Sequence, residues 1–222
     1  MCKIKITKTK NYYGQINQSI LINLEHKKNL GIHTGTFSDG IINLIEKGFI
    51  TNKYKNLNQG RVVATNISGT KRLYEFVHNN PLIELYPVNY THDLTTLSKI
   101  NNLYSINSAL EVDLTGQINA EKYGFYPIAG VGGQMDFIKG SQASLGGKSI
   151  IALPSTAKKH TISRITSSVE QVTSLKTEID YVVTEYGIAS LFGKSLRERM
   201  EEMISIAHPM FREELKSSRL IV

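Results

Sequence analysis

The sequence predicts an α/β fold built on a mostly parallel sheet with helices on both faces. Three observations carry this prediction. The chain of 222 residues is long enough to bury a large core. Short apolar segments with strand character alternate along it with segments of helical spacing, and no internal repeat or low-complexity linker interrupts the series. Because such alternation favours parallel strands joined by right-handed connections, we expect a single domain over residues 1–222.

The first half of the chain supplies the first strands and helices of this series. Residues 1–8 alternate like a strand, and residues 18–28 have helical spacing. Pro87 places the strand that contains it at an edge or an end, because proline lacks a backbone donor. Further elements are expected as a strand over 30–34, a turn-rich loop over 34–40, a helix over 41–48, a strand over 61–65, a helix over 70–79 and a strand over 82–88.

The second half continues the series and contains one strong local signal. Ser195 and Glu198 form a capping-box pattern, which predicts a helix start. Pro209 should stop that helix, and a last helix should begin near Met210. Other elements are expected as a helix over 94–101, a strand over 104–110, a turn over 111–116, a strand over 149–153, a strand over 161–165 and a strand over 179–187.

Composition excludes several classes of protein. Apolar residues make up 41% and charged residues 20%, which is typical of a soluble globular protein. The net charge of +7 favours anionic partners, but Lys and Arg are scattered, so we expect no nucleic-acid partner. Cys2 is the only cysteine, and no cluster of Cys, His and carboxylates has metal-ligand spacing, so no metal is expected. No apolar run approaches a membrane span, and neither a signal peptide nor a transit peptide is evident, so we expect a cytoplasmic protein without a membrane partner.

A glycine-rich stretch over residues 129–137 is the strongest candidate for a binding site. Gly130, Gly132 and Gly133 allow positive φ and close backbone approach, so successive amides can converge on an anion or an oxyanion. Lys158 and Lys159 follow a predicted strand, at the kind of strand end where open α/β sheets bind ligands. The pattern favours a phosphate-bearing ligand with a carbonyl to be polarised. A glycine turn beside a solvated basic loop remains the alternative.

Several long motifs resemble one known family. They are Ser-Ala-Leu-Glu-Val-Asp-Leu-Thr-Gly-Gln at 108–117, Gly-Val-Gly-Gly-Gln-Met-Asp-Phe at 130–137, Ile-Ile-Ala-Leu-Pro-Ser-Thr-Ala-Lys at 150–158 and Val-Val-Thr-Glu-Tyr-Gly-Ile-Ala at 182–189. Together they resemble the acetyl-CoA hydrolase/transferase family of acetate, butyrate and 4-hydroxybutyrate CoA-transferases, over residues 12–215. The resemblance implies the NagB/RpiA/CoA-transferase fold and CoA or acyl-CoA as the substrate. It covers only the C-terminal half of such an enzyme, so the family's N-terminal domain is expected to be absent.

The resemblance also implies a nucleophile that this sequence lacks. In the family a glutamate attacks the thioester and then carries CoA as a glutamyl thioester. The corresponding segment here is residues 32–40, and the position of the glutamate is Gly35. Glycine has no carboxylate, so this departure predicts a catalytically impaired chain.

Other family positions are kept only in part. Of the glycine-rich loop that aligns with residues 12–17, only Gly14 and Ile16 match, and residues 167–176 look about three residues short. The family's CoA contacts carry over to the positions Gly14, Ile16, Gly130, Gly132, Gly133 and Lys158.

Other titratable residues in the shared motifs are expected to have structural roles. Glu111 and Glu185 could replace the lost carboxylate, but both lie in motifs shared with enzymes that use a different glutamate. His33 and His208 are also expected to be structural, and Gln134 and Asp136 should brace the glycine-rich stretch.

Three hypotheses for function follow. The first is a truncated CoA-transferase half that is inactive or impaired. The second is a CoA-binding or oligomerisation module without catalysis, which could dock to an intact relative or form a homo-oligomer. The third is an active enzyme whose N-terminal half comes from another chain, which would need a nucleophile that is not evident here.

Overall fold

A computed structural model describes residues 12–13, 24 and 27–218 of the chain, and it divides into two compact units. Unit 1 contains residues 108–135 and 149–218, and unit 2 contains the described residues up to 107 together with 136–148. Each unit is described by itself. The prediction of a single domain stays a prediction.

Unit 2 is built on a parallel sheet whose strands follow the order β5-β1-β2-β3-β4. The α/β class with mostly parallel pairing is therefore confirmed. The elements of this unit are β1 (Tyr12–Tyr13), β2 (Gly31–Phe37), α2 (Asp39–Glu46), β3 (Val62–Ile67), α3 (Lys71–Val77), β4 (Ile83–Leu85), α4 (Val88–Thr91), α5 (Leu94–Ser98), β5 (Leu103–Asn107) and α6 (Gln134–Ala143), most of which lies in this unit.

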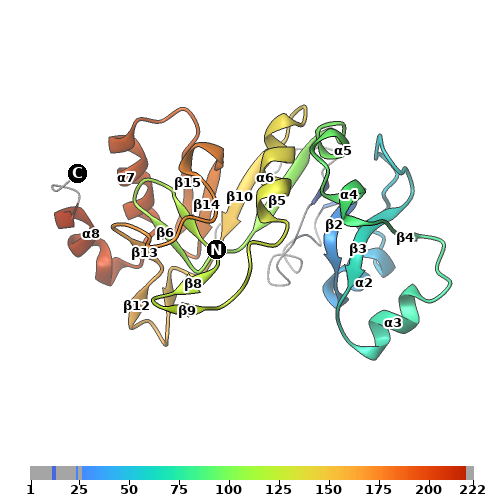
Figure 1. Cartoon of the computed structure of the whole chain (residues 1–222), viewed down its shortest axis with the longest axis horizontal. Helices are drawn as coiled ribbons and strands as arrows, with labels where there is room; N and C mark the ends of the chain where they lie inside the picture. The colour runs from blue at the N-terminus through green and yellow to red at the C-terminus, as the bar shows by residue number, and fades with distance from the viewer. Residues whose placement is uncertain (1–11, 14–23, 25–26, 219–222) are drawn as a thin grey trace. The chain divides into compact units, whose positions relative to one another are not determined.

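Apolar packing around this sheet defines the core of unit 2. Leu97, Ile100, Leu103 and Phe137 form one fully buried cluster, in which α6 supplies the phenylalanine. Burial of each such side chain contributes roughly 1.5–3 kcal/mol. Helix α4 packs against β2 and β3, and α2 packs against α3 (Figure 1). Position 137 is thereby fixed beside the sheet.

Strand β2 is longer than the sequence indicates. The expected loop over 34–40 is wrong in its first half, because Thr36 pairs with Asn66 and Phe37 pairs with Ile67 in parallel register. Phe37 is fully buried. The Gly, Thr and Ser content suggested a turn, but pairing with β3 and burial of Phe37 outweigh these local preferences. Gly35 consequently lies within a strand.

Unit 1 combines a short mixed sheet with small two- and three-stranded pieces. Strand β10 pairs with β14 in parallel, and β14 pairs with β15 antiparallel. Its elements are β6 (Glu111–Asp113), β7 (Ile118–Asn119), β8 (Lys122–Tyr123), β9 (Tyr126–Pro127), β10 (Lys148–Ala152), β11 (Thr156–Ala157), β12 (Ile162–Ser163), β13 (Ile165–Thr166), η2 (Lys176–Glu178), β14 (Tyr181–Thr184), β15 (Gly187–Ser190), α7 (Leu196–Ile206), η3 (Pro209–Phe211) and α8 (Arg212–Ser218).

Several other element predictions need correction. The expected turn over 111–116 begins with β6, which pairs with β13 and β7. Helix α4 was not expected after Pro87, nor was α6 after the glycines. Helix α6 contains the poor helix former Gly140, but burial of Phe137 and Ile138 stabilises it. The predictions of a strand over 1–8 and of a helix over 18–28 lie mainly outside the described residues.

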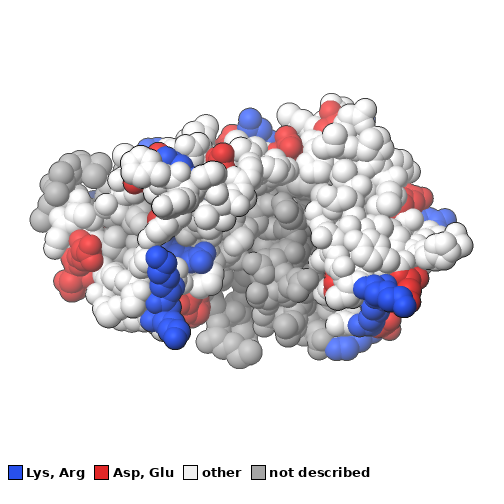
Figure 2. All heavy atoms as spheres, turned by 60° about the horizontal axis from the view of Figure 1, so that its bottom comes forward, with Lys and Arg blue, Asp and Glu red and all other residues white. Residues whose placement is uncertain are grey.

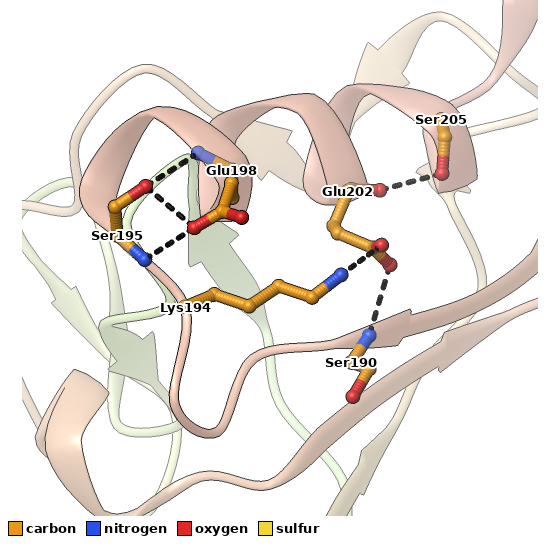
Figure 3. Close-up of polar contacts among 6 residues, drawn as sticks. All are labelled: Ser190, Lys194, Ser195, Glu198, Glu202 and Ser205. Carbon is orange, nitrogen blue, oxygen red and sulfur yellow. Dashed lines mark hydrogen bonds and ion pairs between the residues drawn. The ribbon is translucent and has the colours of Figure 1, made fainter.

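The start of α7 confirms the capping box (Figure 3). The Glu198 backbone N–H donates to Ser195 Oγ over 3.4 Å, and the Ser195 backbone N–H donates to Glu198 Oε2 over 2.8 Å. One turn later, the Glu202 carboxylate accepts from the Ser190 amide over 3.0 Å and from the Lys194 ammonium. These bonds attach the first turns of α7 to β15 and to the loop that follows it.

Removal of the cap should therefore weaken this end of unit 1. We expect Ser195→Ala to lower the free energy of unfolding by about 1 kcal/mol, because the amide of Glu198 loses its acceptor. Urea titration with Ser217→Ala as the control measures this difference, since Ser217 is exposed in α8 and caps no helix. Equal midpoints for the two variants would contradict the assignment.

Candidate functional site

Gly35, which the sequence predicts to be the position of the family's nucleophile, lies near the carboxyl end of β2 between two paired segments. Thr34 pairs with Ala64 and Thr36 pairs with Asn66, so Gly35 is held in regular parallel sheet. Ligands of open parallel α/β sheets bind near this end of the strands. The backbone at Gly35 is partly exposed.

The side chain of His92 fills the space beside Gly35. A Cβ at position 35 would lie 3.1 Å from His92 Nε2 and 3.3 Å from His92 Cε1. Both separations are tighter than ordinary van der Waals contact, so any larger residue at 35 requires the imidazole to move. Phe137 Cε2 lies behind the ring, 3.9 Å from the same Cβ position.

Two neighbours, Thr91 and Phe137, hold the His92 ring in this place. Its Nδ1 lies 2.8 Å from Thr91 Oγ1, which is in turn hydrogen-bonded to Thr65 Oγ1. Its ring meets the Phe137 ring edge-on, with centroids 5.0 Å apart. Burial lowers the pKa of His92, and the negative charge of Asp136 opposes the shift. The neutral imidazole is therefore favoured at neutral pH.

His33 lies behind this position in β2 and is fully buried. Its Nε2 donates to Thr91 O over 3.0 Å, and its Nδ1 has no hydrogen-bond partner among the described residues. Burial, with a further contribution from the Lys55 charge, lowers the pKa of His33 to about 3. This neutral, buried imidazole supports the structural role expected for it.

Lys55 satisfies backbone carbonyls inside unit 2. Its Nζ donates to Ile32 O over 2.9 Å and to Arg61 O over 2.8 Å, and the residue is only 3% exposed. Burial lowers the pKa of Lys55 to about 7, and the charge of Glu84 opposes the shift. Together with Asn52 Oδ1, which accepts from the Ile32 amide, this lysine fixes the start of β2.

The glycine-rich stretch lies in unit 1, immediately before α6. Gly132 has a φ of +57°, which glycine adopts without strain. A Cβ at Gly130 or at Gly132 would meet no described atom within 4 Å, so packing does not explain the glycine at 130. Gln134 is buried and donates to Ser174 Oγ over 3.0 Å, which braces the end of the stretch. Gly133 completes the turn into α6, and backbone amides at the start of a helix are suited to bind an anion.

Lys158 lies at the tip of the hairpin formed by β11 and β12, in the same unit. Its Nζ is 5.5 Å from the ring centroid of Tyr123, whose strand pairs with β9 just before the glycines. Lys158, Lys159 and His160 are consecutive residues with positive φ, between 46° and 69°. Such conformations cost non-glycine residues on the order of 1 kcal/mol each. The tip presents an exposed cation on a conformationally strained turn.

Glu185 and Glu111 have structural partners, as expected from their motifs. Glu185 accepts hydrogen bonds from the backbone and the hydroxyl of Ser155, at 2.9 and 2.5 Å. Partial burial would raise the pKa of Glu185, but the bonds from Ser155 outweigh this effect and lower it. Glu111 Oε2 accepts from Asn119 over 3.1 Å. His208 caps η3 by accepting from the Met210 amide.

The other predictions concern two residues of the first glycine-rich loop, metal binding, membrane insertion and surface charge. Gly14 and Ile16 lie outside the described residues. No group of His, Cys, Asp and Glu side chains within the described ranges could hold a metal ion. None of the helices in the described part of the chain is both long and apolar enough to cross a bilayer. Lys and Arg form several separate groups on the face seen in Figure 2, with acidic side chains among them.

Sequence reasoning did not single out Thr91, His92 or Lys55. His92 lies 57 positions from Gly35 in the chain, and no local pattern indicates that its ring faces that glycine. Lys55 resembles any other lysine of a polar turn. Only the neighbours supplied by the fold reveal these three residues.

Comparison with known proteins agrees with these observations. The sequence signature described as "Acetyl-CoA hydrolase/transferase C-terminal domain" matches residues 69–219. The chain is 51% identical over 205 residues to the 4-hydroxybutyrate coenzyme A transferase of Clostridium kluyveri, with 91% of this chain and 48% of the relative covered. It is 47% identical to the succinyl-CoA:cyclohexane-1-carboxylate CoA transferase of Geobacter metallireducens, with 91% and 47% covered. The chain thus spans about half the length of these relatives.

Solved structures give the same result. RipA from Yersinia pestis matches with a TM-score of 0.90 and 38% identity, covering 95% of this chain and 49% of that protein. The 4-hydroxybutyrate CoA-transferase from Porphyromonas gingivalis matches with a TM-score of 0.86 and 43% identity, covering 97% and 52%. Both similarities extend over nearly the whole of this chain.

Steric coupling between Gly35 and His92 can be measured directly. We expect Gly35→Ala to lower the free energy of unfolding by about 1–3 kcal/mol, because the new methyl group overpacks against the imidazole. In a His92→Ala background the same substitution should cost at least about 0.5 kcal/mol less. Urea unfolding of the four proteins of this cycle gives the coupling energy. Additive effects would mean that the two positions do not compete for space.

Burial of neutral His33 predicts a specific loss of stability in acid. Its folded-state pKa of about 3 lies below its ordinary value of 6.5, so the unfolded chain binds more protons between these values. The contribution to stability is complete above pH 6.5 and is lost as the pH falls, by up to about 1.4 kcal/mol per pH unit. His33→Gln should flatten this dependence between pH 6.5 and 4.5, whereas the exposed control His78→Gln should not. Parallel pH profiles for all three proteins would contradict the assignment.

Proposed function

Because this chain belongs to the acetyl-CoA hydrolase/transferase family, we propose that it binds CoA or an acyl-CoA thioester without forming the family's glutamyl-CoA intermediate. The single observation that carries the second part is the bare backbone at Gly35, with His92 in the space of a side chain. A covalent carrier needs a carboxylate at this position, and glycine supplies none.

The glycine-rich stretch and Lys158 support binding of the cofactor. Gly130 and Gly132 leave free space beside the backbone, and Gly133 leads into the amino end of α6. Amides in such a place favour anionic groups, and Lys158 adds a cation on the neighbouring hairpin. These residues would hold the phosphate-bearing part of CoA or orient its thioester carbonyl.

The matched relatives are about twice as long as the matched region, so the proposal does not extend to their complete reactions. The acyl donors, acids and assemblies of the relatives are therefore not assigned to this chain. We include as partners a chain that supplies the other half, an intact relative, or a second copy. The module without covalent transfer remains the favoured function, because Gly35 argues against the glutamyl route whichever partner is present.

Calorimetry with CoA tests binding and its site. The full chain should bind CoA, and ligand at 100 times its dissociation constant should stabilise it by about 2.7 kcal/mol. Lys158→Ala should weaken binding by about fivefold to tenfold, the scale of one lost charged contact. Lys159→Ala is the matched control, since it removes the same charge from the adjacent position of the same tip.

Two outcomes would overturn this proposal. One is the absence of both heat and thermal shift at millimolar CoA. The other is a glutamyl-CoA adduct, detected by mass spectrometry after incubation with acetyl-CoA. In the second case the covalent route would have survived the loss at position 35.

A further inference from the structure

Resting on the proposed binding of CoA, we propose that the hairpin formed by β8 and β9 is the stacking site for the adenine ring of that ligand. The base would stack on Tyr126, and Lys158 would contact the 3′-phosphate of the same nucleotide. The nucleotide end of CoA thereby receives its own side chains, apart from the glycine-rich stretch. All of these residues belong to unit 1.

Cross-strand pairing places two tyrosine rings on one face of the hairpin. Tyr123 pairs with Tyr126 in antiparallel register, and the side chains of directly paired residues project to the same side. Gly124 takes a φ of +56° in the two-residue turn between them, which leaves Phe125 at the tip. Tyr126 is 75% exposed and Phe125 is 98% exposed. The hairpin thus presents open aromatic rings to solvent.

The base of the hairpin is attached to the rest of unit 1. The amides of Ile128 and Ala129 both donate to Glu121 O, over 2.7 and 3.0 Å. Thr173 Oγ1 donates to the Glu121 carboxylate over 2.7 Å. These bonds join the hairpin directly to the glycine-rich stretch, which begins at Ala129. A surface that is ordered in advance loses less entropy when a ligand binds to it.

A cation lies against the same pair of rings. Lys158 Nζ is 5.5 Å from the centroid of the Tyr123 ring, and the two hairpins lie side by side in Figure 1. The ring of Tyr123 therefore adjoins both the ammonium group and the more exposed ring of Tyr126. This combination suits an adenosine phosphate, because the base can stack on the open ring while the phosphate meets the positive charge.

The exposure of Tyr126 favours a flat, polar ring over the acyl chain of the ligand. An acyl chain gains most from an enclosed apolar pocket, whereas a base can stack on a single exposed aromatic face. No hydrogen bond joins the phenol group of Tyr123 or of Tyr126 to another described residue, so both groups can bond to adenine nitrogens or to ribose hydroxyls.

Calorimetry on the full chain with fragments of CoA tests this assignment. The ligands are CoA, adenosine 3′,5′-bisphosphate, which keeps the base and the 3′-phosphate, and 4′-phosphopantetheine, which lacks the nucleotide. We expect Tyr126→Ala to weaken the binding of CoA and of the bisphosphate by about tenfold, the scale of one lost aromatic stack, and to leave phosphopantetheine unchanged. Tyr126→Phe keeps the ring and should retain the affinity. Phe192→Ala is the matched control, because it removes another exposed ring of unit 1.

Two further measurements distinguish stacking from a general loss of affinity. In saturation-transfer NMR, the adenine H2 and H8 protons of CoA should receive more saturation than the methyl protons of its pantetheine arm, and Tyr126→Ala should remove most of this difference. Lys158→Ala should remove most of the difference in affinity between CoA and 3′-dephospho-CoA, since only CoA carries the 3′-phosphate.

The outcomes separate the adenine site from the proposed function. If CoA binds equally well to the unaltered chain and to Tyr126→Ala, the adenine site is wrong and the proposed function stands. If CoA does not bind but the bisphosphate binds in a manner that depends on Tyr126, the proposed function fails and the adenine site stands. If neither ligand binds, both are overturned. A dimer that Tyr126→Ala converts to monomer in sedimentation equilibrium, with the affinity for CoA unchanged, would assign the hairpin to a second copy of the chain instead.

Discussion

Pairing of β2 with strands on both sides is the constraint on which unit 2 depends. Strand β1 pairs with the first two residues of β2, and β3 pairs with residues 33–34 and 36–37, so a shift of β2 would break the parallel ladder. The groups outside the ladder are satisfied by side chains, because Asn52 accepts from the Ile32 amide and Lys55 donates to the Ile32 carbonyl. Gly35 is therefore held in a fixed position, and its neighbours must adapt to it.

Burial then decides the charge state of the groups around this strand. The free-energy cost of burying the charged form exceeds the stabilisation that nearby groups give it. The pKa values of His33, Lys55 and His92 therefore all fall. The pKa falls to about 3 for His33 and to about 7 for Lys55, which are the two most buried of these groups. His92 is only half-buried, and the charge of Asp136 opposes the fall of its pKa.

Unit 1 contains an exposed turn that is held in a strained backbone conformation. Three consecutive residues, Lys158, Lys159 and His160, take left-handed backbone conformations. The bonds from Ser155 to Glu185 attach the base of this hairpin to the turn that follows β14. Strain of this kind persists only where surrounding contacts over-determine the backbone, and it is frequent at ligand sites. The position of Lys158 follows from these anchors rather than from its own preferences.

The amino-acid sequence by itself determined the α/β class, the capping box at Ser195, the glycine-rich stretch, the family and the absence of a carboxylate at position 35. These features are readable because periodicity, capping patterns and motif order are local properties of the chain. Tertiary structure alone decided that residues 34–37 continue a strand, that α6 follows the glycines and that His92 faces Gly35. Burial and the pairing of distant segments override local preference in these places. His92 and Gly35 are 57 positions apart in the chain, so only the folded structure brings them into contact.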